Sequence, residues 1–220
     1  MKYIIMCGGK YGGWNKPRQL TEICGEPIIA RTIRLLSEQG ISKEDIFISS
    51  NYDDFGRFGV VLLKHENKYG ESKSGTINRW LDAFYPANYS VCYLYGDVFY
   101  SPEAIKTIVE TDTDSIEFFA SKPPYGPGYI KHWEEPFAFK VKDYDLFRHC
   151  IEVTKHYGDI KRFSRYRTDP ISWELWQVIK GTALDVVEYN YTVINDYTCD
   201  VDSMEDAEKI GEWMRCNCQS

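Results

Sequence analysis

The residues best suited to chemistry near the start of the chain are glycines interspersed with cations, in the stretch MKYIIMCGGKYGGWNKPRQL. Glycine has no Cβ, so its backbone N–H groups can approach an anion closely, and nearby cations attract phosphate. The apolar run before the glycines is short enough for a buried parallel strand. The stretch therefore predicts a phosphate-binding loop that follows a first strand. The residues expected to contribute are Met6, Cys7, Gly8, Gly9, Gly12, Lys10, Lys16 and Arg18.

Three aspartates form a second group with chemical potential. Asp97 follows the apolar run 91–95, and Asp200 and Asp202 stand two apart in an extended stretch, so that both side chains point to one side. Ligands of doubly wound sheets bind at the carboxyl ends of the strands. Carboxylates gathered there, beside a phosphate-binding loop, would suit Mg²⁺. For each aspartate alone, a turn residue, a helix cap or a solvated side chain is an equally good interpretation.

The glycine-rich loop matches neither G-x-G-x-x-G nor G-x-x-x-x-G-K-[ST], and a loop of this kind alone is more often an ordinary turn. Here it is followed in order by Pro17-Arg18-Gln19-Leu20 and by a Gly-x-Pro-apolar step over 25–29 (GEPII). This order resembles the nucleotidyltransferase superfamily. Its members include sugar-phosphate nucleotidylyltransferases, molybdopterin guanylyltransferases, and cytidylyltransferases that act on phosphocholine or methylerythritol phosphate.

The resemblance implies roles for particular residues. Asp97 resembles the metal aspartate of the family, and the segment 200–206 (DVDSMED) resembles its second acidic segment, in which Asp202 is the closer match and Asp200 lies beside it. The triplet Ser74, Gly75 and Thr76 resembles the loop that lies against the nucleobase and ribose, although a plain helix start with a capping Ser or Thr is the somewhat better explanation of the triplet taken alone.

The sequence also departs from the family pattern. The family usually has an arginine soon after its glycines, where this chain has Gly13-Trp14-Asn15, so Lys10 or Lys16 must supply the cation for the β- and γ-phosphates. Its usual Pro-Lys is Pro-Arg here, with Arg18 as the clamp on the α-phosphate. Arginine keeps the charge and adds a bidentate fork.

An aromatic loop and a basic run are the candidates for binding the acceptor substrate. In the loop, Tyr129 and Trp133, with Tyr125, Lys131 and His132 nearby, could form a sugar platform or an aromatic box for a quaternary ammonium. Core packing is the commoner role of such aromatic residues. In the basic run, Arg165 and Arg167, with Arg162, could hold the acceptor phosphate. A solvated surface run is an equally good interpretation.

The elements that must position these residues alternate between strand and helix in the first half of the chain. This alternation predicts one α/β domain with a mostly parallel, doubly wound, Rossmann-like or GT-A-like sheet, and a less regular acceptor-side region. We expect a nucleotide-binding part over 1–110, an acceptor-side part over 111–183, and a returning strand, metal segment and closing helix over 184–220. Strands are expected at 3–6, 46–48, 60–63, 91–95, 116–120, 137–141 and 184–194, and helices at 27–39, 77–84, 143–157 and 171–179, after Ser101-Pro102, and after Ser203.

Composition narrows the classes of partner. The net charge of -7 over 220 residues argues against a general nucleic-acid binder. The sequence contains no apolar run long enough for a membrane span and begins without a signal-peptide pattern. Seven scattered cysteines are expected to be reduced thiols, which favours the cytoplasm. The oligomeric state is open, and a homodimer is compatible with the sequence.

The resemblance implies an Mg²⁺-dependent enzyme that transfers a nucleoside monophosphate from an NTP to a phosphorylated small molecule and releases pyrophosphate. CTP is weakly favoured as the NTP, from the acidic-Val-Asp-Ser ending alone. Such enzymes make activated precursors, for example of cell-surface polysaccharides. Two alternatives stay open: a GT-A-type glycosyltransferase that uses a nucleotide-sugar, and a non-catalytic nucleotide-binding module.

Overall fold

The computed structural model describes residues 1–8, 14, 16–65, 80–129, 131, 134–159, 172–184 and 190–217, and the statements below concern these residues. Within them, no helix is both long and apolar enough to cross a membrane. The six cysteines described are free thiols, and four of them are buried.

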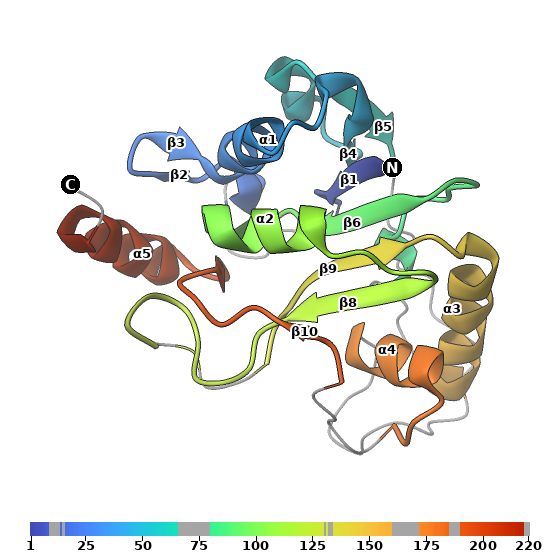
Figure 1. The fold of residues 1–220 in the computed structure, drawn as a ribbon. Coiled ribbons are helices and arrows are strands. Elements are labelled where there is room, and N and C mark those ends of the chain that lie inside the picture. Colours follow the sequence, from blue (N-terminus) through green and yellow to red (C-terminus); the bar gives the residue numbers. More distant parts are fainter. Residues whose placement is uncertain are drawn as a thin grey trace.

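A seven-stranded sheet forms the centre of the molecule, with the strand order β10-β8-β9-β6-β1-β4-β5 (Figure 1). Only β9 runs antiparallel to its neighbours β6 and β8, while the other pairings are parallel. The expectation of a single, mostly parallel α/β domain is therefore confirmed. The strands are β1 (Lys2–Met6), β4 (Ile46–Ser50), β5 (Val61–Lys64), β6 (Val91–Tyr95), β8 (Ile116–Ala120), β9 (Pro136–Val141) and β10 (Thr192–Val193).

The interior strands carry apolar side chains on both faces, and helices and loops bury these side chains by covering the sheet. Ile5 of β1 lies opposite Ile48 of β4 on one side and Leu94 of β6 on the other, and all three side chains are fully buried. Continuous apolar runs of this kind are typical of buried parallel strands, which is why these strands could be predicted from sequence.

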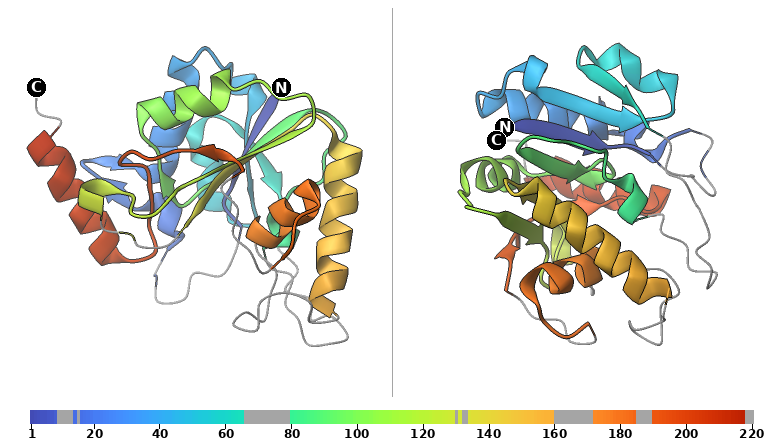
Figure 2. Two further views of the ribbon diagram at one scale, coloured as in Figure 1. Left: turned by 60° about the horizontal axis from the view of Figure 1, so that its bottom comes forward. Right: turned by 90° about the vertical axis from the view of Figure 1, so that its right-hand side faces the viewer.

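The described residues form five α-helices: α1 (Ile28–Glu38), α2 (Pro102–Glu110), α3 (Tyr144–Asp159), α4 (Ser172–Lys180) and α5 (Met204–Asn217). Helices α3 and α4 pack against each other and cover β8 and β9, where the Phe118 ring meets Trp173 at 5.1 Å and the Phe139 ring meets Phe147 at 5.7 Å. Helix α5 lies apart from this pair and packs on the hairpin of β2 (Glu22–Ile23) and β3 (Glu26–Pro27) (Figures 1 and 2).

Two helix starts form as the sequence predicts. The Ser101 hydroxyl accepts a hydrogen bond from the Ala104 amide at 2.8 Å, and Pro102 occupies the first turn of α2. At α5, the Ser203 hydroxyl accepts from the Asp206 amide, and the Asp206 carboxylate accepts from the Ser203 amide, both at 3.1 Å. This reciprocal pair is a capping box.

Two expected elements differ from the observed structure. Of the strand expected over 184–194, only Thr192–Val193 pairs in the sheet, and 185–189 lie outside the described residues. Side chains hold the segment before β10 instead, since Asn190 accepts from the Trp176 indole and the Tyr191 hydroxyl donates to the Ser121 carbonyl.

The helix expected over 77–84 is described only at its end, which is the short 3-10 helix η4 (Leu81–Ala83), and Phe84 is already extended. Pro86 disfavours helical backbone at Tyr85, the residue before it, so the helix could not continue past this point.

Candidate active site

The site begins where β1 and β6 end side by side. The Gly96 amide donates to the Met6 carbonyl at 3.1 Å. A Cβ at position 96 would lie 2.5 Å from the Met6 carbonyl oxygen and 2.6 Å from the Cys7 Sγ, closer than real Cβ contacts allow. Only glycine allows the ends of β1 and β6 to approach this closely, which explains why a glycine precedes Asp97. The next residue, Asp97, is thereby fixed beside the end of β1.

A second, very short ladder brings the acidic segment of the C-terminal region to Asp97. Strand β7 (Val98–Phe99) pairs antiparallel with β11 (Cys199–Asp200), and the Val201 amide donates to the Asp97 carbonyl at 2.9 Å. The ladder sets Asp97 and Asp202 at the same edge of the fold. The predicted convergence of these two residues is therefore observed.

Arg18 lies between the two aspartates. It opens the 3-10 helix η1 (Arg18–Leu20), and its Nη1 lies 2.9 Å from Asp202 Oδ1 and 3.5 Å from Asp97 Oδ2. The Arg18 side chain is 24% exposed, that of Asp97 26% and that of Asp202 53%, so water or a ligand can reach all three. The cation predicted as a phosphate clamp thus occupies the mouth of the acidic site.

Asp200 lies beside Asp202 but is buried, and it takes part in an inner network of hydrogen bonds and ion pairs. The Tyr125 hydroxyl donates to Asp200 Oδ1 at 2.7 Å, and the Lys131 ammonium lies 3.4 Å from Asp200 Oδ2 and 3.3 Å from Asp206 Oδ2. Tyr125 and Lys131 also exchange two backbone hydrogen bonds of 3.1 Å. Both residues were candidates for an acceptor platform, but Tyr125 is fully buried and Lys131 is 4% exposed. Both residues therefore pack in the core, as the alternative interpretation of the aromatic loop has it, and they hold the acidic segment in place.

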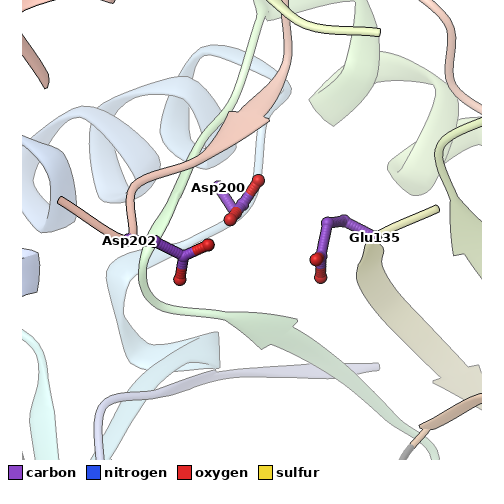
Figure 3. Close-up of side chains that lie close together, drawn as sticks. All are labelled: Glu135, Asp200 and Asp202. Carbon is purple, nitrogen blue, oxygen red and sulfur yellow. The ribbon is translucent and has the colours of Figure 1, made fainter. Parts of the chain in front are cut away.

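Glu135 is a carboxylate that the sequence reasoning missed. One carboxylate oxygen from each of Glu135, Asp200 and Asp202 lies within 4.8 Å of the others (Figure 3). Glu135 directly precedes β9. Because β9 is antiparallel, its start lies at the edge where the parallel strands end. The signal in the sequence was an acidic pair before an apolar strand, but the direction of that strand could not be read from it.

The electrostatics of the three aspartates follow from their surroundings. Burial raises the pKa of Asp97, although Arg18 opposes this effect. Burial, the hydrogen bond with Asp202 and the charge of Glu135 raise the pKa of Asp200. Burial also acts to raise the pKa of Asp202, but the bond with Asp200 and the charges of Lys131 and Arg18 outweigh it and leave that pKa lowered. Asp202 is therefore the most readily ionised of the three.

The remaining predicted residues are only partly described. Met6 and Cys7 are buried, and the Cys7 amide and carbonyl bond to Ser49 and Ser50 of β4, which fixes the start of the loop. Gly8 is half-buried, Lys16 is exposed two residues before Arg18, and Tyr129 ends the turn η5 (Pro127–Tyr129). The others lie outside the described residues: Gly9, Lys10, Gly12, Ser74, Gly75, Thr76, His132, Trp133, Arg162, Arg165 and Arg167.

No family model matches the sequence, and no curated protein matches it by sequence comparison. Solved structures do match over nearly the whole chain. The inositol-1-phosphate CTP transferase from T. maritima has a TM-score of 0.55 at 14% identity, covering 97% of this chain and 96% of its own. The 4-diphosphocytidyl-2C-methyl-D-erythritol synthase from Anaerococcus prevotii has a TM-score of 0.57 at 13% identity, covering 97% and 95%. This chain has the nucleotidyltransferase fold.

A further structure with the nucleotidyltransferase fold, a CMP:2-keto-3-deoxy-manno-octonic acid synthetase complexed with CTP, matches with a TM-score of 0.55 at 12% identity and covers 98% of this chain and 99% of its own. Within this fold, the donors gathered around Asp97 and Asp202 are carboxylate oxygens, which are the ligands that Mg²⁺ prefers. The chemistry of the donor set therefore fits a magnesium ion.

Proposed function

We propose that the protein is an Mg²⁺-dependent nucleotidyltransferase, which transfers a nucleoside monophosphate from an NTP to a phosphorylated small molecule and releases pyrophosphate. The observation that carries the proposal is the position of Arg18 within 3.5 Å of both Asp97 and Asp202. A cation for phosphate and two carboxylates for a metal, drawn from three distant segments, meet at one partly exposed point. The nucleotidyltransferase fold of the whole chain supports the same activity.

The chemistry needs little beyond positioning and charge. The acceptor phosphate is already an anionic nucleophile, so no general base is required. Arg18 would bind the α-phosphate and stabilise the charge that develops there, while Lys10, Lys16 and the loop glycines would hold the departing pyrophosphate. A magnesium ion on Asp97 and Asp202, when bound, supplies charge neutralisation at the same phosphate. Asp200 would assist by keeping Asp202 oriented.

In this proposal, different parts of the chain bind the nucleotide, the acceptor and the metal ion. Residues 1–110 bind the nucleotide, with 74–76 against the base and ribose, and 184–220 return the second metal carboxylate. Residues 111–183 bind the acceptor, through Tyr129, Trp133, Arg165 and Arg167. CTP is the first NTP to test, because fold neighbours include a CTP transferase and a synthetase complexed with CTP. We propose a cytoplasmic role in making activated precursors.

The decisive experiment incubates the protein with Mg²⁺, each of the four NTPs and a panel of phosphorylated acceptors, including inositol 1-phosphate and methylerythritol phosphate, and measures pyrophosphate. Pyrophosphate that depends on both NTP and acceptor supports the proposal. Nucleoside diphosphate released from a nucleotide-sugar would instead indicate a glycosyltransferase, and nucleotide binding without products would indicate a binding module.

Matched variants test the site itself. Asp97→Asn should abolish turnover while the protein stays folded, because it removes a charge at the mouth of the acidic site. Asp112→Asn is the control, since Asp112 is exposed and pairs with Lys142 elsewhere on the surface. Equal turnover in the two variants would refute the role of Asp97.

A further inference from the structure

Two of the cations that the structure describes lie at the acidic site, and they differ sharply in their surroundings. Arg18 holds the outer carboxylates, Asp97 and Asp202, and its side chain is 24% exposed. Lys131 holds the inner carboxylates, Asp200 and Asp206, and its side chain is only 5% exposed. A ligand phosphate can therefore draw Arg18 away, whereas Lys131 has almost no access to solvent or ligand.

The backbone and neighbours of Lys131 fix its ammonium in the inner half of the site. Two backbone hydrogen bonds tie Lys131 to Tyr125, whose own hydroxyl is bonded to Asp200. The ammonium lies 3.4 Å from Asp200, 3.3 Å from Asp206 and 3.7 Å from Asp202. Moving it aside would leave buried carboxylates without their cation, and leaving a buried charge unpaired is strongly unfavourable.

Two of the carboxylates that contact Lys131, Asp200 and Asp202, belong to the acidic group that could hold an ion. Asp200 and Asp202, with Glu135, each offer an oxygen within 4.8 Å of the others. A magnesium ion binds its oxygen ligands at about 2.1 Å, so an ion on Asp200 and Asp202 would stand directly against the ammonium. The ammonium and the magnesium ion would repel each other at that distance, so the fixed Lys131 ammonium prevents a magnesium ion from binding there.

We propose that Lys131 is a permanent internal cation, which occupies the inner half of the acidic site and confines a divalent ion to Asp97 and Asp202. It is a positioning residue in this role, because it acts on the metal through the carboxylates that it neutralises. The inference rests on the proposed function only in taking Asp97 and Asp202 as the metal pair. It predicts that the wild-type protein binds one ion and that removal of the ammonium opens a second site.

The test counts bound Mn²⁺ by electron paramagnetic resonance, titrating wild-type protein and the variant Lys131→Met in the presence of CMP, whose single phosphate binds Mn²⁺ far more weakly than a triphosphate does. We expect one ion in the wild type and two in Lys131→Met, with the second ion bound at least tenfold more tightly than any further ion in the wild type. Lys140→Met is the matched control, since Lys140 is also 4% exposed but donates to the backbone carbonyls of Val109 and Thr111. The control should bind one ion.

Other outcomes separate this inference from the proposed function. Equal numbers and affinities in wild type and Lys131→Met would overturn the inference, as would two ions in the wild type. If the wild type bound no ion and Lys131→Met bound one, the result would support the exclusion of metal by Lys131. The same result would refute Asp97 and Asp202 as the metal pair. Should Lys131→Met fail to fold, Lys131→Gln gives the same comparison, and an Mn²⁺-induced rise in its melting temperature that the wild type lacks supports the inference.

Discussion

The close approach of the chain at Gly96 predicts that even a methyl group there disturbs both the fold and the site. In Gly96→Ala, the new Cβ would lie 2.5 Å from the Met6 carbonyl oxygen and 2.6 Å from the Cys7 sulfur. The first neighbour is backbone of β1, which is paired on both sides, so the end of β6 must move instead. Overpacking of this kind costs about 1–3 kcal/mol. For a chain of this size, each kcal/mol lowers the melting temperature by roughly 2–4 °C.

The expected fall in melting temperature is therefore about 2–12 °C, measured by circular dichroism or calorimetry. The rate of pyrophosphate release should fall by more than the loss of stability alone explains. The reason is that Asp97 moves with Gly96, although it must stay beside Asp202. Gly56→Ala is the matched control, since a Cβ there meets nothing within 4 Å. Should Gly96→Ala match Gly56→Ala in both melting temperature and pyrophosphate release, the account of the Gly-Asp step would be wrong.

Three further predictions concern separate parts of the fold. Arg18→Met should lower kcat/KM for pyrophosphate release by about 10²–10³-fold with little change in melting temperature, and Arg18→Lys should recover part of the loss because it keeps the charge without the fork. Tyr125→Phe should lower the free energy of unfolding by about 1–3 kcal/mol in a urea titration, because Asp200 loses a buried hydrogen-bond donor. The pKa of Glu26 is lowered in the folded state, chiefly by its hydrogen bond from Arg34. The Glu26 carboxylate therefore stabilises the fold at pH values above its pKa in the unfolded chain. This stabilisation is lost as the pH falls through the pKa of Glu26 in the folded protein. Glu26→Gln should then cost about 0.5–1 kcal/mol at pH 7, after allowance for solvent screening of a partly exposed pair, and nothing at strongly acidic pH.

The strands that position the site were predictable because each is a short apolar run that is buried on both faces, as in β1 and β6. The meeting of Asp97 and Asp202 was predictable because strand ends share one edge of the sheet. Glu135 was missed because its position depends on the direction of β9, which no local pattern encodes.

The buried roles of Tyr125 and Lys131 could not be predicted for a different reason. Their loop is rich in aromatic and polar residues, and such composition fits an exposed platform and a buried brace equally well. The choice between the two depends on Asp200 and Asp206, which lie roughly seventy residues further along the chain. Only the folded structure shows that Lys131 finds three carboxylates within 3.7 Å.

The two-residue ladder between β7 and β11 also makes the acidic site depend on a segment that is synthesised late. Arg18 and Asp202 are 184 residues apart, and the strands on which Arg18 and Asp97 depend are complete long before β11 leaves the ribosome. A domain generally folds as a unit, so Arg18 and Asp97 can gain their partner carboxylate only after residue 202 has been synthesised. All seven strands of the main sheet precede Asp202 in the sequence, so a chain that stopped short of Asp202 would contain every one of these strands and still lack half of this pair.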